Sequence, residues 1–231
     1  MARNSEPKLQ RVVRALRTQH GPVLAPPASN AFEHLLWEKV AYLATDERRA
    51  AAFEQLRIKV GLTPKAILDA KPKLLREIAA LGGRVAVDDR VRHMQDAAAV
   101  VLDEFGGSLD SVGSLPFRDA VRALERFHGI GEPGAARILL LTRAHKSLPL
   151  DSNGARVLLR IGYGREDKSY SAMYRSVQEA AEPERQATFD WLIDAHLLLR
   201  RHGQSVCKAS VPRCEACSVN LSCDYFAKRS A

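Results

Sequence analysis

The stretch CKASVPRCEACSVNLSC, residues 207–223, contains all four cysteines of the chain in the spacing C-x6-C-x2-C-x5-C. Four thiolates this close in sequence can bind one inorganic centre. Zinc is one alternative, because four-cysteine zinc sites also use a C-x2-C pair, but zinc ribbons usually have two such pairs and this stretch has one. Disulfides are another, although no further cysteine is left to link the stretch to the rest of the chain. The spacing favours an iron–sulfur cluster over zinc, and either over disulfides.

The residues that flank these cysteines carry a resemblance to a known family. His202-Gly203 precedes the first cysteine, Pro212-Arg213 precedes the second, and Asp224-Tyr225 follows the last. With the cysteine spacing, this pattern resembles the cluster loop of the endonuclease III family, the iron–sulfur branch of the helix-hairpin-helix (HhH-GPD) DNA glycosylase superfamily. The resemblance implies a 4Fe–4S cluster with four ligands, Cys207, Cys214, Cys217 and Cys223.

Composition and charge limit the size of the core, the kind of partner and the cellular location that we expect. The chain has 231 residues, 46% of them hydrophobic, which allows one large core or two modest ones. Its net charge of +8 favours a polyanionic partner, although a charge that serves only solubility would give the same number. No apolar run is long enough to span a membrane, so no membrane partner is expected. The clustered cysteines favour a reducing cytoplasm, with the nucleoid as the location in a bacterium.

The pattern of apolar residues is helical along most of the chain. Residues 1–9 read as a loose tail without a secretory signal. Helices are predicted at 10–18, from Ala31 onward, and at 47–59, 64–69, 72–81 and 88–105. In the helix that begins at Ala31, one apolar stripe is formed by Phe32, Leu35, Leu36, Val40 and Leu43. Because no segment alternates with period two, the predicted fold class is all-α.

A helix-turn-helix pattern follows. Phe117, Ala120, Val121, Leu124 and Phe127 predict an amphipathic helix, and a second helix begins near Pro133. Between them, Gly129-Ile130-Gly131 can turn tightly and expose N–H groups beside a helix N-terminus, where a phosphate can bind. A Gly-x-Gly turn alone is weak evidence of binding. In this context it resembles the DNA-binding hairpin of the glycosylases, which implies that these three residues contact the DNA backbone.

Asp151 follows the hairpin in the segment Leu148-Pro149-Leu150-Asp151-Ser152-Asn153. Its local sequence favours an ordinary helix N-cap. The order of hairpin, helix, short Pro-containing loop and aspartate nevertheless resembles the signature of the superfamily, and Asp151 matches its catalytic aspartate. A carboxylate suits that role, because breaking an N-glycosidic bond passes through a cationic sugar that a nearby negative charge stabilises.

One departure from the family concerns strand cleavage. Bifunctional members carry a lysine four residues after the first hairpin glycine, and its amine attacks C1′ of the sugar. This chain has Pro133 there, and its ring nitrogen belongs to an amide and cannot attack. Lys146, before Asp151, is a possible substitute, although a solvated loop lysine is the simpler interpretation. This departure therefore favours a monofunctional enzyme. The alternative is a bifunctional enzyme that uses a displaced lysine.

Glu38 aligns with the glutamate of the adenine- and thymine-mismatch branch of the family. It lies off the apolar stripe, on the side of Tyr42, so it faces either solvent or a groove. A solvated glutamate is the default, and a general acid that protonates the leaving base is the role that the resemblance implies. Leu43 replaces a glutamine that helps to fill the space left by the extruded base. The loop 81–87 lacks the usual wedge residue, and Arg84 or Val85 is the substitute that we expect.

The resemblance implies two helical lobes with a DNA groove between them. A six-helix barrel with the hairpin covers residues 29–145, and an iron–sulfur lobe joins residues 1–28 to 146–231. The function that follows is hydrolysis of the N-glycosidic bond of a damaged or mismatched base, flipped from double-stranded DNA, by a monomeric enzyme of base excision repair. Two alternatives are a bifunctional glycosylase/AP lyase and a DNA-binding relative without catalysis. A ferredoxin-like electron carrier is disfavoured by the hairpin and the basic charge.

Overall fold

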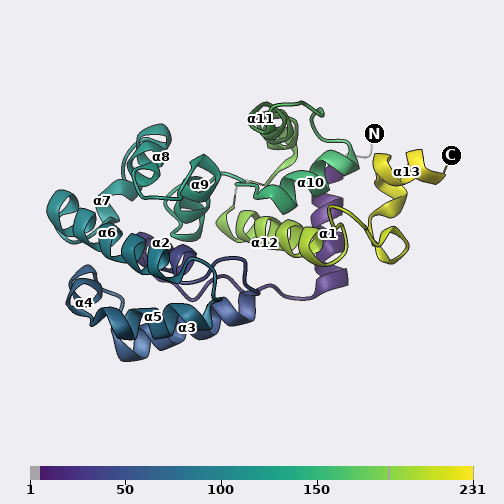
Figure 1. Cartoon of the computed structure of the whole chain (residues 1–231). Coiled ribbons are helices and arrows are strands. Elements are labelled where there is room, and N and C mark those ends of the chain that lie inside the picture. The colour runs from purple at the N-terminus through teal and green to yellow at the C-terminus, as the bar shows by residue number, and fades with distance from the viewer. Residues whose placement is uncertain (1–5, 187, 231) are drawn as a thin grey trace. The chain divides into compact units, whose positions relative to one another are not determined.

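The computed structural model describes residues 6–186 and 188–230 of the chain. Within these residues all regular structure is helical and no strand occurs, which confirms the all-α prediction (Figure 1). The chain divides into two compact units. The central unit is Pro26–His145, and the terminal unit combines Met1–Ala25 with Lys146–Ala231. No helix in the described part of the chain is long and apolar enough to cross a membrane.

The central unit is a set of helices packed around one apolar core. Its helices are α2 (Ala31–Lys39), α3 (Asp46–Lys59), α4 (Pro64–Asp69), α5 (Pro72–Leu81), α6 (Val87–Phe105), α7 (Asp110–Gly113), α8 (Phe117–Glu125) and α9 (Glu132–Leu141). Buried side chains from several of them meet in the core, among them Leu36, Phe53, Met94, Leu124 and Ile138. The predicted ranges 64–69 and 72–81 coincide with α4 and α5, and those at 47–59 and 88–105 begin one residue late.

Side-chain caps explain where several of these helices begin. The Asn30 side chain accepts the Glu33 N–H at 3.0 Å, and the Glu33 carboxylate accepts the Ser29 N–H at 2.7 Å. Such reciprocal bonds satisfy amide protons that have no partner within the helix. The hydroxyl groups of Thr45 and Thr63 each accept one backbone N–H at the start of α3 and α4.

The predicted apolar stripe of α2 is wrong at its last member. Phe32, Leu35, Leu36 and Val40 are buried, but the Leu43 side chain is 80% exposed. The helix ends at Lys39, and Leu43 lies in the next loop with a left-handed φ of 48°. Helical periodicity therefore no longer applies to residue 43, and its side chain points out of the core.

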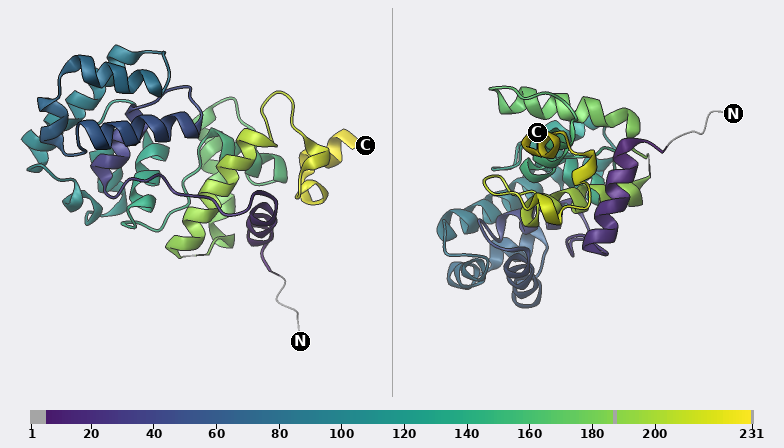
Figure 2. Two further views of the ribbon diagram at one scale, coloured as in Figure 1. Left: turned by 90° about the horizontal axis from the view of Figure 1, so that it is seen from below. Right: turned by 90° about the vertical axis from the view of Figure 1, so that its right-hand side faces the viewer.

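The terminal unit joins the two ends of the chain. It contains α1 (Lys8–His20), α10 (Ser152–Ile161), α11 (Tyr170–Ala181), the 3-10 helix η1 (Glu182–Glu184), α12 (Phe189–Ser205), the 3-10 helices η2 (Cys214–Ala216) and η3 (Asn220–Ser222), and α13 (Asp224–Ser230). The helix α12 packs against both α10 and α1, so segments far apart in sequence share one core (Figures 1 and 2). The first helix is longer than the predicted 10–18, and the predicted tail lies in part outside the described residues.

Candidate functional site

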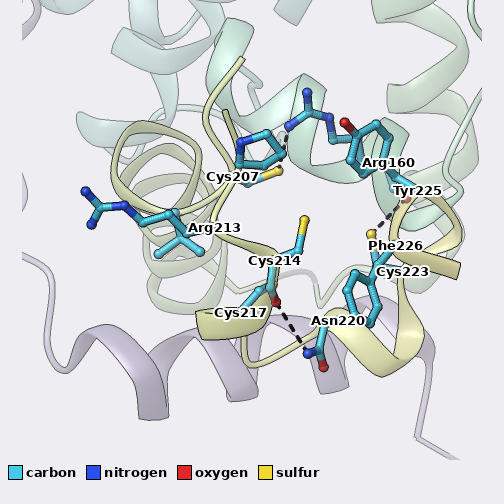
Figure 3. Close-up of a pocket in the computed structure, with 11 residues that line it drawn as sticks. Arg160, Cys207, Arg213, Cys214, Cys217, Asn220, Cys223, Tyr225 and Phe226 are labelled. Carbon is cyan, nitrogen blue, oxygen red and sulfur yellow. Dashed lines mark hydrogen bonds between the residues drawn. The ribbon is translucent and has the colours of Figure 1, made fainter. Parts of the chain in front are cut away.

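The four cysteines line one cavity in the terminal unit, as Figure 3 shows. They come from the segment between α12 and α13, where the short helices η2 and η3 turn the chain back on itself. All four thiols are half-buried and free of disulfides, so disulfides are excluded in this structure. The rest of the lining is largely apolar and includes Val206, Pro212 and Phe226. In the described residues, no group of three or more His, Cys, Asp or Glu side chains is placed to hold one metal ion.

Polar groups from neighbouring helices approach the sulfur atoms. Arg160 Nη1 lies 3.4 Å from Cys207 Sγ, and the Cys223 thiol donates to the Arg160 carbonyl at 3.2 Å. His202 Nε2 lies 3.4 Å from Cys217 Sγ. Burial raises the pKa of the Cys217 and Cys223 thiols, and the neighbouring cysteines raise it further. Burial also lowers the pKa of His202 to about 4, with a smaller contribution from His20.

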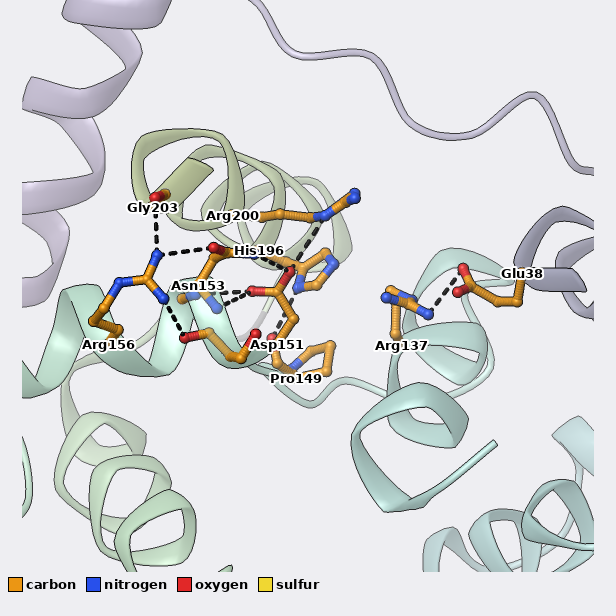
Figure 4. Close-up of polar contacts among 11 residues, drawn as sticks. Glu38, Arg137, Pro149, Asp151, Asn153, Arg156, His196, Arg200 and Gly203 are labelled. Carbon is orange, nitrogen blue, oxygen red and sulfur yellow. Dashed lines mark hydrogen bonds and ion pairs between the residues drawn. The ribbon is translucent and has the colours of Figure 1, made fainter. Parts of the chain in front are cut away.

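Asp151 is the N-cap of α10, as its local sequence predicts. Its Oδ1 accepts the N–H groups of Asn153 at 3.0 Å and Gly154 at 2.8 Å. Its Oδ2 lies 3.3 Å from Arg200 Nε of α12 (Figure 4). The carboxylate is thus fixed by a helix N-terminus on one side and a guanidinium on the other, with 21% of the side chain exposed.

The loop before Asp151 is held by buried polar contacts. His196 Nδ1 lies 2.9 Å from the Pro149 carbonyl, and the Leu150 N–H donates to the Tyr174 hydroxyl at 3.3 Å. Arg156 extends this network to the cysteine segment, because it donates to the carbonyls of Gly203 at 2.8 Å and Cys207 at 3.0 Å. The Asp151 helix and the cysteine segment are therefore parts of one hydrogen-bonded assembly.

The hairpin lies in the central unit between α8 and α9. Gly129 has a left-handed φ of 75°, which favours glycine, whereas Gly131 has extended backbone and is the N-cap of α9. Ile130 is buried, and its N–H bonds the Phe127 carbonyl at 3.0 Å, so it anchors the turn from inside. The buried Lys39 Nζ donates to the His128 carbonyl at 2.5 Å. Burial lowers the pKa of Lys39 to about 8, against the smaller opposing effects of Glu38 and Asp96.

A cavity of about 640 Å³ lies beside the hairpin. The structure brings four predicted residues together in its wall, namely Glu38, Leu43, Gly129 and Ile130. Glu38 Oε1 pairs with Arg137 Nη2 at 2.8 Å, and both side chains are largely covered (Figure 4). Glu38 therefore lies at a cavity wall, and the solvated-surface interpretation of this residue does not hold. The wall also includes Lys39 and Arg90, which sequence reasoning missed.

Arg90 connects the two loops that edge this cavity. Its guanidinium is buried and donates to the carbonyls of Val40 at 2.7 Å, Val85 at 3.1 Å and Gly83. The first carbonyl belongs to the segment that leads to Leu43, and the other two to the loop that carries Arg84. Arg84 is exposed in that loop and does not line the cavity. One buried cation thus fixes the backbones that present Leu43 and Arg84 to solvent.

No protein-family profile matches the chain. The chain is 28% identical over 204 residues to endonuclease III of Sulfolobus acidocaldarius, which covers 85% of this chain and 83% of that protein. It is 31% identical over 107 residues to endonuclease III of Rickettsia conorii, covering 46% and 47%. It is 27% identical over 220 residues to the chloroplastic endonuclease III homologue 1 of Arabidopsis thaliana, covering 89% and 52%. The chain thus spans about half the length of these last two relatives.

Solved structures agree in fold. A structure of endonuclease III trapped in a covalent intermediate with DNA superposes with a TM-score of 0.74 at 19% identity, over 96% of this chain and 97% of that one. A thermostable thymine-DNA glycosylase gives a TM-score of 0.72 at 18% identity, over 95% of each. These likenesses show that the chain shares its fold with endonuclease III and with the thymine-DNA glycosylase. The sequence relatives and the fold together support the endonuclease III-like branch of the HhH-GPD superfamily.

Proposed function

We propose that this protein is a DNA glycosylase of base excision repair, which hydrolyses the N-glycosidic bond of a damaged or mismatched base flipped out of duplex DNA. One observation carries the proposal: a carboxylate, Asp151, fixed by two backbone N–H groups and by Arg200, in a chain of the endonuclease III-like branch. The net charge of +8 supports DNA as the partner. We expect the enzyme to act as a monomer and without a membrane partner.

Asp151 is the catalytic residue of the proposed reaction. As the N–C1′ bond breaks, positive charge develops on the sugar, and a carboxylate that is already oriented stabilises that charge without reorganisation. The same carboxylate can orient or deprotonate the attacking water. Its double anchorage supports both roles, because the side chain cannot turn away from the charge that it stabilises.

Glu38 is the proposed acid for the leaving base. It lines a cavity of about 640 Å³, which lies within the range of about 300–1,000 Å³ typical of ligand pockets. Its Oε1 pairs with Arg137 Nη2 at 2.8 Å, which holds the carboxylate at the cavity wall. In the proposed reaction, Glu38 donates a proton to the leaving nitrogen of a base that enters the cavity.

DNA contacts are assigned to the hairpin and to the two loops that Arg90 connects. The backbone N–H groups of Gly129 and Gly131 beside the N-terminus of α9 suit a phosphate, and Ile130 holds the turn in shape. The exposed Leu43 and Arg84 are the side chains proposed to fill the space that the flipped nucleotide leaves in the base stack.

The proposed reaction ends at an intact abasic site. Pro133 lies in the first turn of α9 at the position where a lysine would attack, and the exposed Lys146 rests over the Phe189 ring, 5.4 Å from its centroid. The names of the relatives favour a second candidate, a glycosylase that also cleaves the strand. Lys39 is then another amine to consider, because it lines the cavity and its lowered pKa makes the neutral, nucleophilic form more accessible.

A 4Fe–4S cluster is the proposed cofactor, with Cys207, Cys214, Cys217 and Cys223 as its ligands. Four free thiols around one largely apolar cavity fit this group, because soft thiolates are the usual ligands of iron–sulfur clusters. When bound, the cluster supplies ligation energy that stabilises the fold of the C-terminal segment. The hydrolytic step itself uses Asp151 and water.

A panel of duplex oligonucleotides, each with a single lesion or mismatch, tests the proposed function. Base release is detected as strand breakage after alkali treatment. We expect release from at least one duplex and none from the undamaged control. Tight binding across the panel without any base release would instead identify a DNA-binding relative that has lost catalysis.

A further inference from the structure

A chain of three side chains leads from the surface of the terminal unit to one cysteine. His20 Nε2, at the end of α1, lies 3.0 Å from His202 Nδ1 of α12. On the other side of the same ring, His202 Nε2 lies 3.4 Å from Cys217 Sγ. His202 is buried and His20 is partly exposed. The resemblance to the glycosylases gives His202 no role, and Asp151 and the hairpin do not use it.

The C-terminal half of α1 also holds the backbone on both sides of Cys217. Gln19 Nε2 donates to the Ala216 carbonyl at 2.6 Å, and Gln19 Oε1 accepts the Ser218 N–H at 3.1 Å. The Ser218 hydroxyl donates to the Ala15 carbonyl at 3.4 Å. Helix α1 therefore positions Cys217 through the backbone of the residues on either side of it, and His202 approaches its sulfur. Among the described contacts, no other cysteine has both features.

The chemistry of the three groups fixes the direction of the hydrogen bonds. A cysteine sulfur that binds iron has lost its proton and can only accept, so His202 Nε2 must carry the hydrogen. A neutral imidazole carries one N–H, which leaves His202 Nδ1 as an acceptor. His20 Nε2 must then donate to it. The order is His20 to His202 to Cys217, and both rings are restricted to one tautomer.

We propose that His202, oriented by His20, is the positioning residue that donates a hydrogen bond to the Cys217 thiolate and thereby sets the reduction potential and the retention of the cluster. The inference rests on the proposed 4Fe–4S cofactor. A hydrogen bond to a ligand sulfur withdraws electron density from the cluster and stabilises its more reduced form, which raises the potential. Partners outside the first coordination sphere also slow the loss of metal, and removing one typically costs about 10- to 100-fold in affinity.

His202→Leu tests this inference, with His202→Gln as the conservative variant and His196→Leu as the matched control. His196 is equally buried on the same helix, but its ring contacts the Pro149 carbonyl and none of the cysteines. Two quantities are measured on each purified protein: the rate of iron transfer to a chelator, and the midpoint potential of the cluster. Iron content and visible absorption are recorded first.

We expect His202→Leu to release iron about ten-fold faster and to have a lower midpoint potential than the parent. His202→Gln, which retains an N–H donor, should restore both quantities toward the parent values, and His196→Leu should leave the potential unchanged. Equal potentials in the parent and in His202→Leu would overturn the inference alone, as would an equal shift in His196→Leu. A parent protein without iron would overturn the cofactor proposal and the inference with it.

Discussion

Asp151 is the N-cap of α10 and the proposed catalytic residue at the same position. As an N-cap it satisfies amide protons at the start of α10, a contribution of about 1 kcal/mol in typical helices. As a carboxylate it supplies the charge that the proposed reaction needs. Asparagine caps helices about as well as aspartate, so Asp151→Asn separates the two purposes, whereas Asp151→Ala removes both.

Whether the enzyme also cleaves the DNA strand depends on whether one of its amines can attack C1′ of the sugar. We expect that borohydride added during turnover traps no covalent protein–DNA adduct, because Pro133 cannot form a Schiff base. The measurement is a search for a shifted band in a denaturing gel, with strand breaks scored before and after alkali. A strong trapped band in the parent would contradict this expectation. The variants Lys146→Ala and Lys39→Met would then identify the amine responsible.

The lowered pKa of Lys39 predicts how the free energy of unfolding varies with pH, and this prediction does not involve DNA. Its folded-state pKa of about 8 lies below the ordinary value of 10.5, so between these values the unfolded chain binds a proton that the folded chain does not. The destabilising effect of the buried charge is therefore complete below about pH 8 and disappears as the pH rises toward 10.5. The free energy of unfolding of the parent, minus that of Lys39→Met, should rise across this window. Denaturant unfolding at a series of pH values measures it, and a constant difference would argue against a buried charge.

Some of these residues could be identified from the sequence and others could not. The gathering of the four cysteines around one cavity was predictable, because they lie within 17 residues and thiolates are the usual ligands of soft metals. Lys39, Arg90 and His202 were not, because each bonds a carbonyl or sulfur that is far away in sequence or on another element. A backbone carbonyl carries no residue type, and so no spacing pattern reveals such a partner.

The hairpin between α8 and α9 offers a test in which DNA binding should change while folding stability does not. Gly131 has extended backbone that any residue can adopt, and a Cβ there would meet only Pro133, at 3.9 Å. Because Gly131 is the N-cap of α9, an aspartate at this position should cap the helix at least as well as glycine does. Gly131→Asp should therefore keep the stability of the parent while it weakens DNA binding, since its charge repels the phosphate.

The matched control for this variant is Ser111→Asp, which adds the same charge to an exposed site on α7 in the same unit. Affinities for duplex DNA at two salt concentrations and melting temperatures measure the two effects. If Gly131→Asp binds as tightly as the control, the hairpin is a turn without a role in DNA binding.

The limits of a helix were predicted correctly where proline marks its first turn, and wrongly where neither glycine nor proline marks its end. Pro64 and Pro72 begin α4 and α5, and the two predicted ranges match the structure at both ends. The helix α2 ends without a glycine or proline, and periodicity alone extended its stripe to Leu43. The helices α11 to α13 follow Asp151 in a part of the sequence where the cysteine pattern, rather than periodicity, guided the interpretation.

The cysteine segment belongs to the terminal unit, so we expect loss of the proposed cluster to destabilise this unit more than the central unit. We expect Cys214→Ser to lose the yellow-brown colour of the cluster and to lower the melting temperature of the terminal unit, because ligation energy is folding energy there. Hydrogen exchange should accelerate around residues 206–230 and remain slow in α3 and α5, which have their own core. A colourless parent protein with bound zinc would contradict the cofactor on which this prediction rests.

Single-turnover base release by the parent and by Asp151→Asn, on a duplex that the parent processes, tests the proposed catalytic role of Asp151. We expect release to fall about 100-fold or more in Asp151→Asn, while DNA affinity and melting temperature stay close to those of the parent. Asp167→Asn is the matched control, because Asp167 is an exposed aspartate of the same unit whose carboxylate also accepts a backbone N–H, that of Ser169 at 2.7 Å. Its base release should equal that of the parent. If Asp151→Asn releases the base as fast as the control, Asp151 is a helix cap and the proposed mechanism is wrong.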